Sequence, residues 1–308
     1  MSKISVVGSF VMDLIGTVDE FPKEGQTVIG KSFYTMPGGK GANQAVAAAR
    51  LGADVAMYGR VGADGYGDAF LTLFEAEGID VSDVKQLSDY PTALGLIQIN
   101  KHAENKIVVI PGANFGYTLE DVKKDAGKFS NSEYVIVQLE LQHDVTYKII
   151  ETCYDAGVNV ILNPAPAVPI PSEVLSKVTY LTPNETELEI LSGLSVQSVE
   201  DAKKAIQKLL DFGVKHVVAT LGSKGALVGD MYGFDLIPGY EVEAIDTVAA
   251  GDSFNGAVAA ALSRGVELRE AVRYANAVGA LTVTKKGAIP ALPSANEVEN
   301  FILGSPQL

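Results

Sequence analysis

Short apolar segments separated by helix-forming runs constrain the fold of this chain more than any other feature. Strand candidates lie at 4–7, 54–58, 134–137, 159–162, 180–181 and 216–220, and a helical run spans 199–210. This alternation predicts a parallel sheet covered by helices. The chain has 308 residues, 47% of them hydrophobic, which is enough for one large α/β core and a small accessory sheet. Such sheets serve many chemistries, so the fold class alone does not identify a function.

The segment 246–257 is the strongest candidate for a site of chemistry. It reads Asp-Thr-Val-Ala-Ala-Gly-Asp-Ser-Phe-Asn-Gly-Ala and leads directly into a helix-forming run. The small residues Ala249, Ala250 and Gly251 allow their backbone N–H groups to approach an anion, and a helix that begins near Asp252 adds its positive dipole end. The carboxylate of Asp252 is then suited to accept a proton from an attacking hydroxyl. The pattern indicates phosphoryl transfer to an alcohol, although a helix N-terminus with ordinary capping residues is also compatible with it.

A second glycine-rich turn leads into a helix near the N-terminus. Residues 37–44 read Pro-Gly-Gly-Lys-Gly-Ala-Asn-Gln, and a run of small residues follows to Gly52. Two such junctions about 200 residues apart suggest two walls of one cleft. Purely structural alternatives remain open here, because Asn43 is also suited to capping a helix. Asn184 and Glu187, spaced three apart, likewise fit an N-cap followed by an acidic first turn.

Five motifs together resemble one known family along nearly the whole chain. They are Gly-Gly-Lys-Gly-Ala-Asn-Gln-Ala at 38–45, Asn-Pro-Ala-Pro-Ala at 163–167, Thr-Pro-Asn-Glu-Thr-Glu at 182–187, Thr-Leu-Gly-Ser-Lys-Gly at 220–225 and the segment 246–257. In this combination and order the chain resembles the ribokinase-like (pfkB) family of carbohydrate kinases. The resemblance implies one kinase domain over 1–308, a three-layer α/β sandwich with a mostly parallel central sheet. It also implies a small β-sheet lid with strands drawn from about 14–36 and 92–112.

The resemblance implies a role for each matching position. Asp252 is the expected base, and the backbone of Ala249, Ala250 and Gly251 the expected anion hole. The expected sugar-binding residues are Val11, Met12, Asp13, Gly39, Lys40, Gly41, Asn43, Glu140 and Asp252. Those expected for ATP are Asn184, Glu187, Thr220, Leu221, Gly222, Ser223, Lys224, Gly225, Gly251 and Asn276.

Two cations are implied by the same resemblance. Mg²⁺ is expected near Glu187, bound largely through waters and phosphates. K⁺ is expected beside the anion hole, in a site that requires mostly backbone oxygens. The positions that match this site are Asp246, Val248, Thr282, Lys285, Gly287 and Ala291.

The expected reaction is ATP-dependent phosphorylation of the 5-hydroxyl of D-ribose, to ribose 5-phosphate and ADP. Val11 departs from the family pattern, which often has asparagine at this position, so another pentose, deoxyribose or a nucleoside remains an alternative acceptor. A non-catalytic sugar or nucleotide sensor is the alternative from a different class. A dinucleotide oxidoreductase is disfavoured, because residues 8–13 lack the required G-x-G-x-x-G turn.

One apparent phosphate-binding motif has the wrong surroundings. Residues 25–32 satisfy the spacing G-x-x-x-x-G-K-S, but no buried strand precedes them and no helix-forming run follows. The β-branched centre of this segment predicts a strand instead, and residues 92–99 predict another.

Charge and cysteine content narrow the expected partners. The net charge of −14 gives no electrostatic help towards nucleic acid or an anionic membrane, so neither is an expected partner. Cys153 is the only cysteine, which excludes an intrachain disulfide. It is expected to lie on a helix and to serve in packing rather than as a nucleophile. No signal peptide or long apolar stretch is evident, which predicts a cytoplasmic protein. A homodimer through the lid strands is expected, because small exposed sheets tend to have their edges covered.

Overall fold

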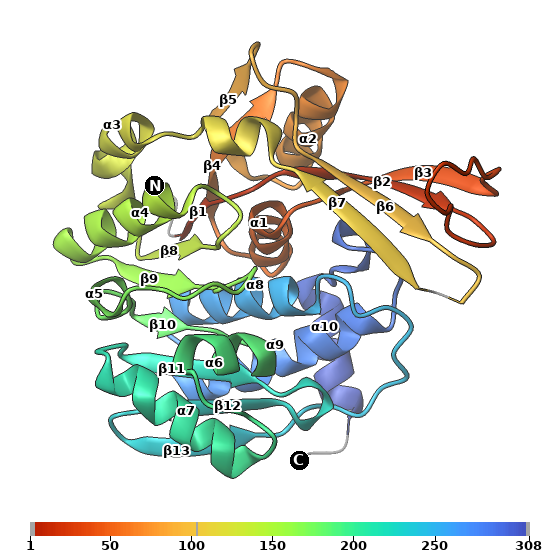
Figure 1. Cartoon of the computed structure of the whole chain (residues 1–308). Helices are drawn as coiled ribbons and strands as arrows, with labels where there is room; N and C mark the ends of the chain where they lie inside the picture. The colour runs from red at the N-terminus through yellow and green to blue at the C-terminus, as the bar shows by residue number, and fades with distance from the viewer. Residues whose placement is uncertain (1–3, 103, 306–308) are drawn as a thin grey trace.

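The computed structural model describes residues 4–102 and 104–305, and a nine-stranded sheet forms its centre (Figure 1). The strand order is β13-β12-β11-β10-β9-β8-β1-β4-β5, with parallel pairing from β5 to β11 and antiparallel pairing of β12 and β13. All six predicted strands are confirmed, five of them with the predicted ends. The strands are β1 (Ile4–Val7), β4 (Val55–Gly62), β5 (Asp80–Leu87), β8 (Tyr134–Val137), β9 (Asn159–Leu162), β10 (Tyr180–Leu181), β11 (His216–Thr220), β12 (Ala226–Asp230) and β13 (Gly233–Ile237).

Helices cover both faces of this sheet, because successive residues of each strand point to opposite sides and both sides are apolar. Ile4 and Val6 of β1 belong to one buried core, whereas Val7 belongs to the other. The first core packs under α1 (Lys40–Arg50), α2 (Gly65–Ala76), α8 (Ala250–Ser263), α9 (Leu268–Val283) and α10 (Ala295–Gly304). The second packs under α3 (Leu119–Phe129), α4 (His143–Asp155), α5 (Ser172–Leu175), α6 (Glu185–Ser192) and α7 (Val199–Asp211). The predicted three-layer fold is confirmed, and Cys153 is buried in α4 as expected.

A smaller four-stranded sheet, here called the small sheet, projects from the main body (Figure 1). Its order is β3-β2-β6-β7, with β2 (Val11–Thr17), β3 (Ser32–Gly38), β6 (Leu94–Ile99) and β7 (Asn105–Ile110). Every residue of β7 is exposed. Strand β2 follows β1 after only three residues, so the small sheet is connected directly to an interior strand of the large one, the third from its β5 edge.

The strand predicted within residues 25–32 is wrong. Residues 26–30 have no regular structure, and β3 begins only at Ser32. Ile29 is 89% exposed, so its β-branched side chain gains no packing that would stabilise a strand. The rejection of a phosphate-binding loop here holds, because neither a buried strand before this segment nor a helix after it is present.

Three short 3₁₀ turns complete the elements, η1 (Gly112–Gly116), η2 (Gly222–Lys224) and η3 (Ile289–Ala291). Within 4–102 and 104–305, none of the helices combines the length and apolar character needed to cross a lipid bilayer.

Candidate active site

The two glycine-rich junctions predicted from the sequence meet at the N-termini of α1 and α8. Gly39 precedes α1 with a φ of 93°, and a Cβ at this position would lie 2.7 Å from the backbone nitrogen of Val11. Ala249 precedes α8 with a φ of 60°, the only positive φ of a non-glycine residue in the described part of the chain. This left-handed conformation costs about 1 to 2 kcal/mol, and such strain concentrates at functional sites. The first-turn N–H groups of α8, as at every helix N-terminus, have no partners inside the helix.

Close contact between α1 and α8 sets the distance between these two N-termini. A Cβ on Gly256 would lie 2.7 Å from the Cβ of Ala47 and 2.8 Å from the backbone oxygen of Gln44. Residues four apart share one face of a helix, so Asp252 lies one turn above Gly256 on the side that faces α1. The absence of a side chain at Gly256 therefore allows the side chains of α1 to reach Asp252.

Asp252 is 7% exposed, and two amide side chains of α1 donate to its carboxylate. Nδ2 of Asn43 lies 2.8 Å from Oδ2, and Nε2 of Gln44 lies 3.0 Å from Oδ1. Asn43 is not a helix cap, since Gly39 is the N-cap residue of α1. Its Oδ1 atom is buried and has no hydrogen-bond partner, so it is available to a ligand.

Polar residues of the proposed sugar site lie on the side of Asp252 that adjoins β2. Glu140, just after β8, accepts hydrogen bonds from the backbone N–H of Lys40 at 2.9 Å and from the hydroxyl of Ser9 at 2.5 Å. Burial opposes the charge of Lys40, but Asp252, Glu140 and Glu187 outweigh it and raise the pKa of the ammonium above its usual value. Burial, assisted by the charge of Glu140, raises the pKa of Asp13 to about 6. One cation thus lies among several carboxylates, an arrangement suited to binding a polyhydroxy compound.

The backbone beside Asp13 is fixed by residues that sequence reasoning missed. Asn114 of η1 accepts from the N–H of Phe10 at 3.0 Å and donates to the carbonyl of Phe10 at 2.9 Å. Val11 and Met12 follow and are nearly buried, at 7% and 4% exposure. Gly41 is equally enclosed, because a Cβ there would lie 2.5 Å from the nitrogen of Ser9. An asparagine in a 3₁₀ turn has no sequence signature, and only its contact with Phe10 identifies it.

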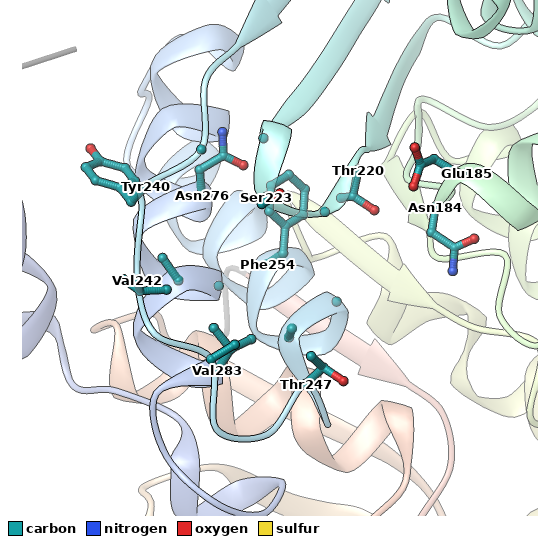
Figure 2. Close-up of a pocket in the computed structure, with 18 of the residues that line it drawn as sticks. Asn184, Glu185, Thr220, Ser223, Tyr240, Val242, Thr247, Phe254, Asn276 and Val283 are labelled. Atoms are coloured by element: carbon teal, nitrogen blue, oxygen red, sulfur yellow. The ribbon is translucent and has the colours of Figure 1, made fainter. Parts of the chain in front are cut away.

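A cavity of about 980 Å³ lies on the other side of the α8 N-terminus. Figure 2 shows Asn184 and Thr220 on one side of it, with Tyr240, Val242 and Asn276 on the opposite side. The cavity brings together seven of the residues predicted for ATP, namely Asn184, Thr220, Gly222, Ser223, Gly225, Gly251 and Asn276. Further lining residues, not predicted, are Glu185, Thr186, Gly239, Tyr240, Glu241, Val242, Ala244, Thr247, Ala280, Val283, Phe254 and Gly279; Ala250, predicted only for the anion hole, also lines it. Most of these come from the connection after β13 and from α9, which contain none of the five motifs apart from the start of the 246–257 segment.

Three predicted nucleotide residues do not line this cavity. Leu221 is buried at 4% exposure, and Lys224 belongs to η2 without facing the cavity. Glu187 forms a capping box with Asn184 at the start of α6, so the structural alternative for this pair is confirmed. Burial nevertheless raises the pKa of Glu187 despite its bond from the Asn184 backbone, and its carboxyl is within electrostatic reach of Lys40 and Asp252. Glu187 therefore caps α6 and at the same time lies within electrostatic reach of the predicted base, Asp252.

The residues predicted for a monovalent cation come from two chain segments, 246–248 and 282–291, which Asp246 joins. Its Oδ1 accepts from the N–H of Val248 at 3.1 Å, and its Oδ2 accepts from the N–H of Gly287 at 2.9 Å. Thr282 and Ala291, on either side of Gly287 in the chain, are fully buried. The ammonium group of Lys285 forms a salt bridge of 2.7 Å with the carboxylate of Glu297. The side chain of Lys285 thus has a structural partner, which leaves only its backbone carbonyl for an ion.

Comparison with known proteins places this chain in a family. The model of the pfkB family of carbohydrate kinases matches residues 1–295. The chain is 40% identical to a ribokinase of Haemophilus influenzae over 97% of this chain and 98% of that one, and 39% identical to a ribokinase of Bacillus subtilis over 98% and 100%. A deoxyribokinase of Salmonella typhi is 35% identical over 97% and 98%. The solved structure of an Arabidopsis thaliana ribokinase with ribose and ATP superposes with a TM-score of 0.92 at 31% identity, covering 99% of both chains. The chain therefore belongs to the pfkB family of carbohydrate kinases.

Proposed function

We propose that this protein transfers the γ-phosphoryl group of ATP to the 5-hydroxyl of D-ribose, which yields ribose 5-phosphate and ADP. The observation that carries the proposal is the position of Asp252. Its carboxylate lies at the N-terminus of α8, next to Gly251 in the wall of the cavity and within hydrogen-bond distance of Asn43 on the opposite side. The ribokinases that match over nearly the full length support ribose as the acceptor.

The chain's own residues account for the chemistry. Asp13, Lys40, Glu140 and Asn43 hold the sugar hydroxyls and orient one of them towards Asp252. The Asp252 carboxylate accepts the proton of that hydroxyl as its oxygen attacks phosphorus. The backbone N–H groups at Ala249–Asp252 and the dipole of α8 stabilise the negative charge that develops on the transferred group.

The site fits both cations. Among the residues that the structure describes, no three His, Cys, Asp or Glu side chains gather to hold a metal ion, so Mg²⁺ would be bound mainly by nucleotide phosphates and water, with Glu187 nearby. There it would neutralise phosphate charge. For K⁺, Asp246 and the carbonyl oxygens of the 246–248 and 282–291 segments provide hard oxygen donors, and Asp246 joins these segments. A cation at this place would stabilise the loop that shapes the anion hole.

Deoxyribose is the second candidate acceptor, and Val11 is the observation that favours it. An apolar side chain at this nearly buried position cannot donate to a sugar hydroxyl, and a deoxyribokinase is 35% identical to this chain. One net hydrogen bond is worth roughly 0.5 to 1.5 kcal/mol, enough to change sugar preference but not to abolish binding.

The small sheet acts, in this proposal, as a lid and as the surface of a homodimer. Ile107, Val108 and Val109 of β7 are 53% to 60% exposed, a continuous apolar strand at a sheet edge. Such edges are normally covered, and a second copy of the small sheet has the matching apolar surface. Sedimentation velocity should show a dimer that Val108→Lys dissociates, whereas a monomeric wild-type protein would refute this arrangement. We also expect a cytoplasmic location, where ATP is available.

The test of the function is ADP release from Mg-ATP with ribose, deoxyribose, other pentoses, hexoses and nucleosides. Ribose should give the highest kcat/KM, and the Asp252→Asn variant should bind nucleotide normally yet lose several orders of magnitude in kcat. Near-normal turnover of this variant would eliminate Asp252 as the base. Absence of turnover with every acceptor would instead favour a non-catalytic sensor.

A further inference from the structure

Gln44 is completely buried beside Asp252, and both ends of its side-chain amide have partners. Nε2 donates to Oδ1 of Asp252 and to Oδ1 of Asn163, each at 3.0 Å. Oε1 accepts from Nε2 of Gln138 at 2.7 Å. Gln138 comes from the end of β8 and Asn163 directly follows β9, so two strands of the central sheet hold this side chain of α1.

The acceptors at the ends of this network fix the orientation of each amide. An ionised aspartate accepts hydrogen bonds and does not donate, so Gln44 must present its NH₂ group to Asp252. Asn163 in turn donates its Nδ2 to the backbone carbonyl of Thr182 at 3.5 Å, which leaves its oxygen towards Gln44. Rotation of the Gln44 amide by 180° would place its oxygen against two other oxygens. The donor that faces Asp252 is therefore specified by the whole network.

Asn43 differs from Gln44 in a way that separates their roles. Asn43 donates to the other carboxylate oxygen, Oδ2, and its own Oδ1 has no partner, so Asn43 keeps an acceptor that a sugar hydroxyl can use. Gln44 has no unused polar atom, because both its donor and its acceptor groups are occupied by protein. A ligand gains nothing by contacting it.

We infer that Gln44 is a positioning residue that holds Asp252 in its reactive orientation throughout the reaction. The inference rests on the proposed function of Asp252 as base. With Oδ1 fixed by Gln44, Oδ2 is the oxygen left for the acceptor hydroxyl, next to Asn43, whose own Oδ1 is free to accept from the sugar. Without Gln44, the carboxylate is free to rotate towards Lys40, the cation within electrostatic reach of it. A misplacement of about 1 Å at a reacting group costs on the order of 100-fold in rate.

The test is a kinetic comparison of Gln44→Met with the wild-type enzyme and with Asp252→Asn. Methionine keeps the length of the side chain and removes the donor. We expect kcat to fall about 100-fold, while KM for ATP and for the sugar changes less than about three-fold. Gln207→Met is the matched control, because Gln207 also donates to an aspartate, Asp211 at 2.8 Å, but on the exposed surface of α7. It should retain wild-type kinetics.

A double variant separates positioning from a general structural role. If Gln44 acts through Asp252, adding Gln44→Met to Asp252→Asn should lower the residual kcat no further. An equal loss in both backgrounds, or a kcat of Gln44→Met within about two-fold of wild type, would overturn the inference. Should Gln44→Met not fold, Gln44→Leu is the second variant, because leucine also lacks the donor and adds no charge beside Asp252, and the same outcomes apply. Normal turnover of Asp252→Asn alone would refute the proposed base itself, which distinguishes the two failures.

Discussion

Gly256 of α8 lies directly against the backbone carbonyl of Gln44 in α1, 212 positions earlier in the chain, with room for a hydrogen atom but not for a methyl group. A Cβ at Gly256 would fall 2.8 Å from that oxygen and 2.9 Å from the nitrogen of Ala48. This contact brings the amides of Asn43 and Gln44 to the Asp252 carboxylate. The geometry of the candidate base thus depends on a residue that never meets substrate.

Gly256→Ala should separate α1 from α8. We expect a loss of about 1 to 3 kcal/mol in the free energy of unfolding, as for other overpacked cores, together with a reduced kcat. Urea denaturation and steady-state kinetics measure both effects. Gly127→Ala in α3 is the control, because a Cβ there meets nothing within 4 Å. This control should stabilise the protein by about 0.5 to 1 kcal/mol.

Gly95→Ala should weaken sugar binding selectively. A Cβ at Gly95 in β6 would collide with Oδ1 of Asp13 in the neighbouring strand β2. Displacement of this carboxylate should raise KM for the sugar more than about 10-fold, the equivalent of 1.4 kcal/mol, and leave KM for ATP unchanged. Gly16→Ala in the same sheet meets nothing within 4 Å and should behave as wild type. An unchanged sugar KM in Gly95→Ala would remove Asp13 from the sugar site.

Sugar binding should weaken in mild acid because of Asp13. Its pKa is raised to about 6 by burial and by Glu140, so it gains a proton as the pH falls through 6 and loses acceptor capacity for sugar hydroxyls. KM for the sugar, measured from pH 8 to 5, should rise below pH 6 in the wild type. Asp13→Asn, which starts with a higher KM, should show a flatter dependence. Equal slopes for the two proteins would assign the titration to another group.

Asp13→Asn should also stabilise the folded protein at neutral pH. The folded-state pKa is above the unfolded value near 3.9, so the buried charge opposes folding fully above pH 6, and protonation relieves this penalty between pH 6 and 4. After allowance for residual solvation, the gain should be about 1 kcal/mol at pH 8 and should vanish by pH 4. Urea unfolding at both pH values measures it. A gain that does not change with pH would indicate a packing effect instead.

Replacement of K⁺ by Na⁺ should lower kcat if the 246–248 and 282–291 segments bind a monovalent cation. Asp246→Asn leaves only one oxygen to serve the N–H groups of both Val248 and Gly287, so the two loops should separate. We expect this variant to lose activation by K⁺ in a titration against choline at constant ionic strength. Lys285→Met removes only the salt bridge to Glu297, so this variant should retain activation by K⁺. Persistent activation in Asp246→Asn would place the cation elsewhere.

The sequence alone determined six of the nine strands of the large sheet, all but β5, β12 and β13, and it indicated Asp252 as the expected base. Strands such as Ile4–Val7 and Tyr134–Val137 are apolar on both faces, so they are recognisable wherever they lie in the chain. Asp252 is recognisable because small residues and a helix start surround it locally. Exposed segments gave weaker signals, and the strand expected around Ile29 was wrong because β-branched residues stabilise strands only where they pack.

Only the tertiary structure decided how the base is held. Asn43 and Gln44 lie more than 200 positions from Asp252 and contact it solely because Gly256 allows α1 and α8 to approach. Most of the walls of the large cavity, including Tyr240 and Phe254, were likewise not predicted, because the cavity forms between elements distant in the chain. Local sequence specifies backbone conformation and burial through short-range preferences. Contacts between distant side chains depend on how the helices and strands pack, which no local pattern records.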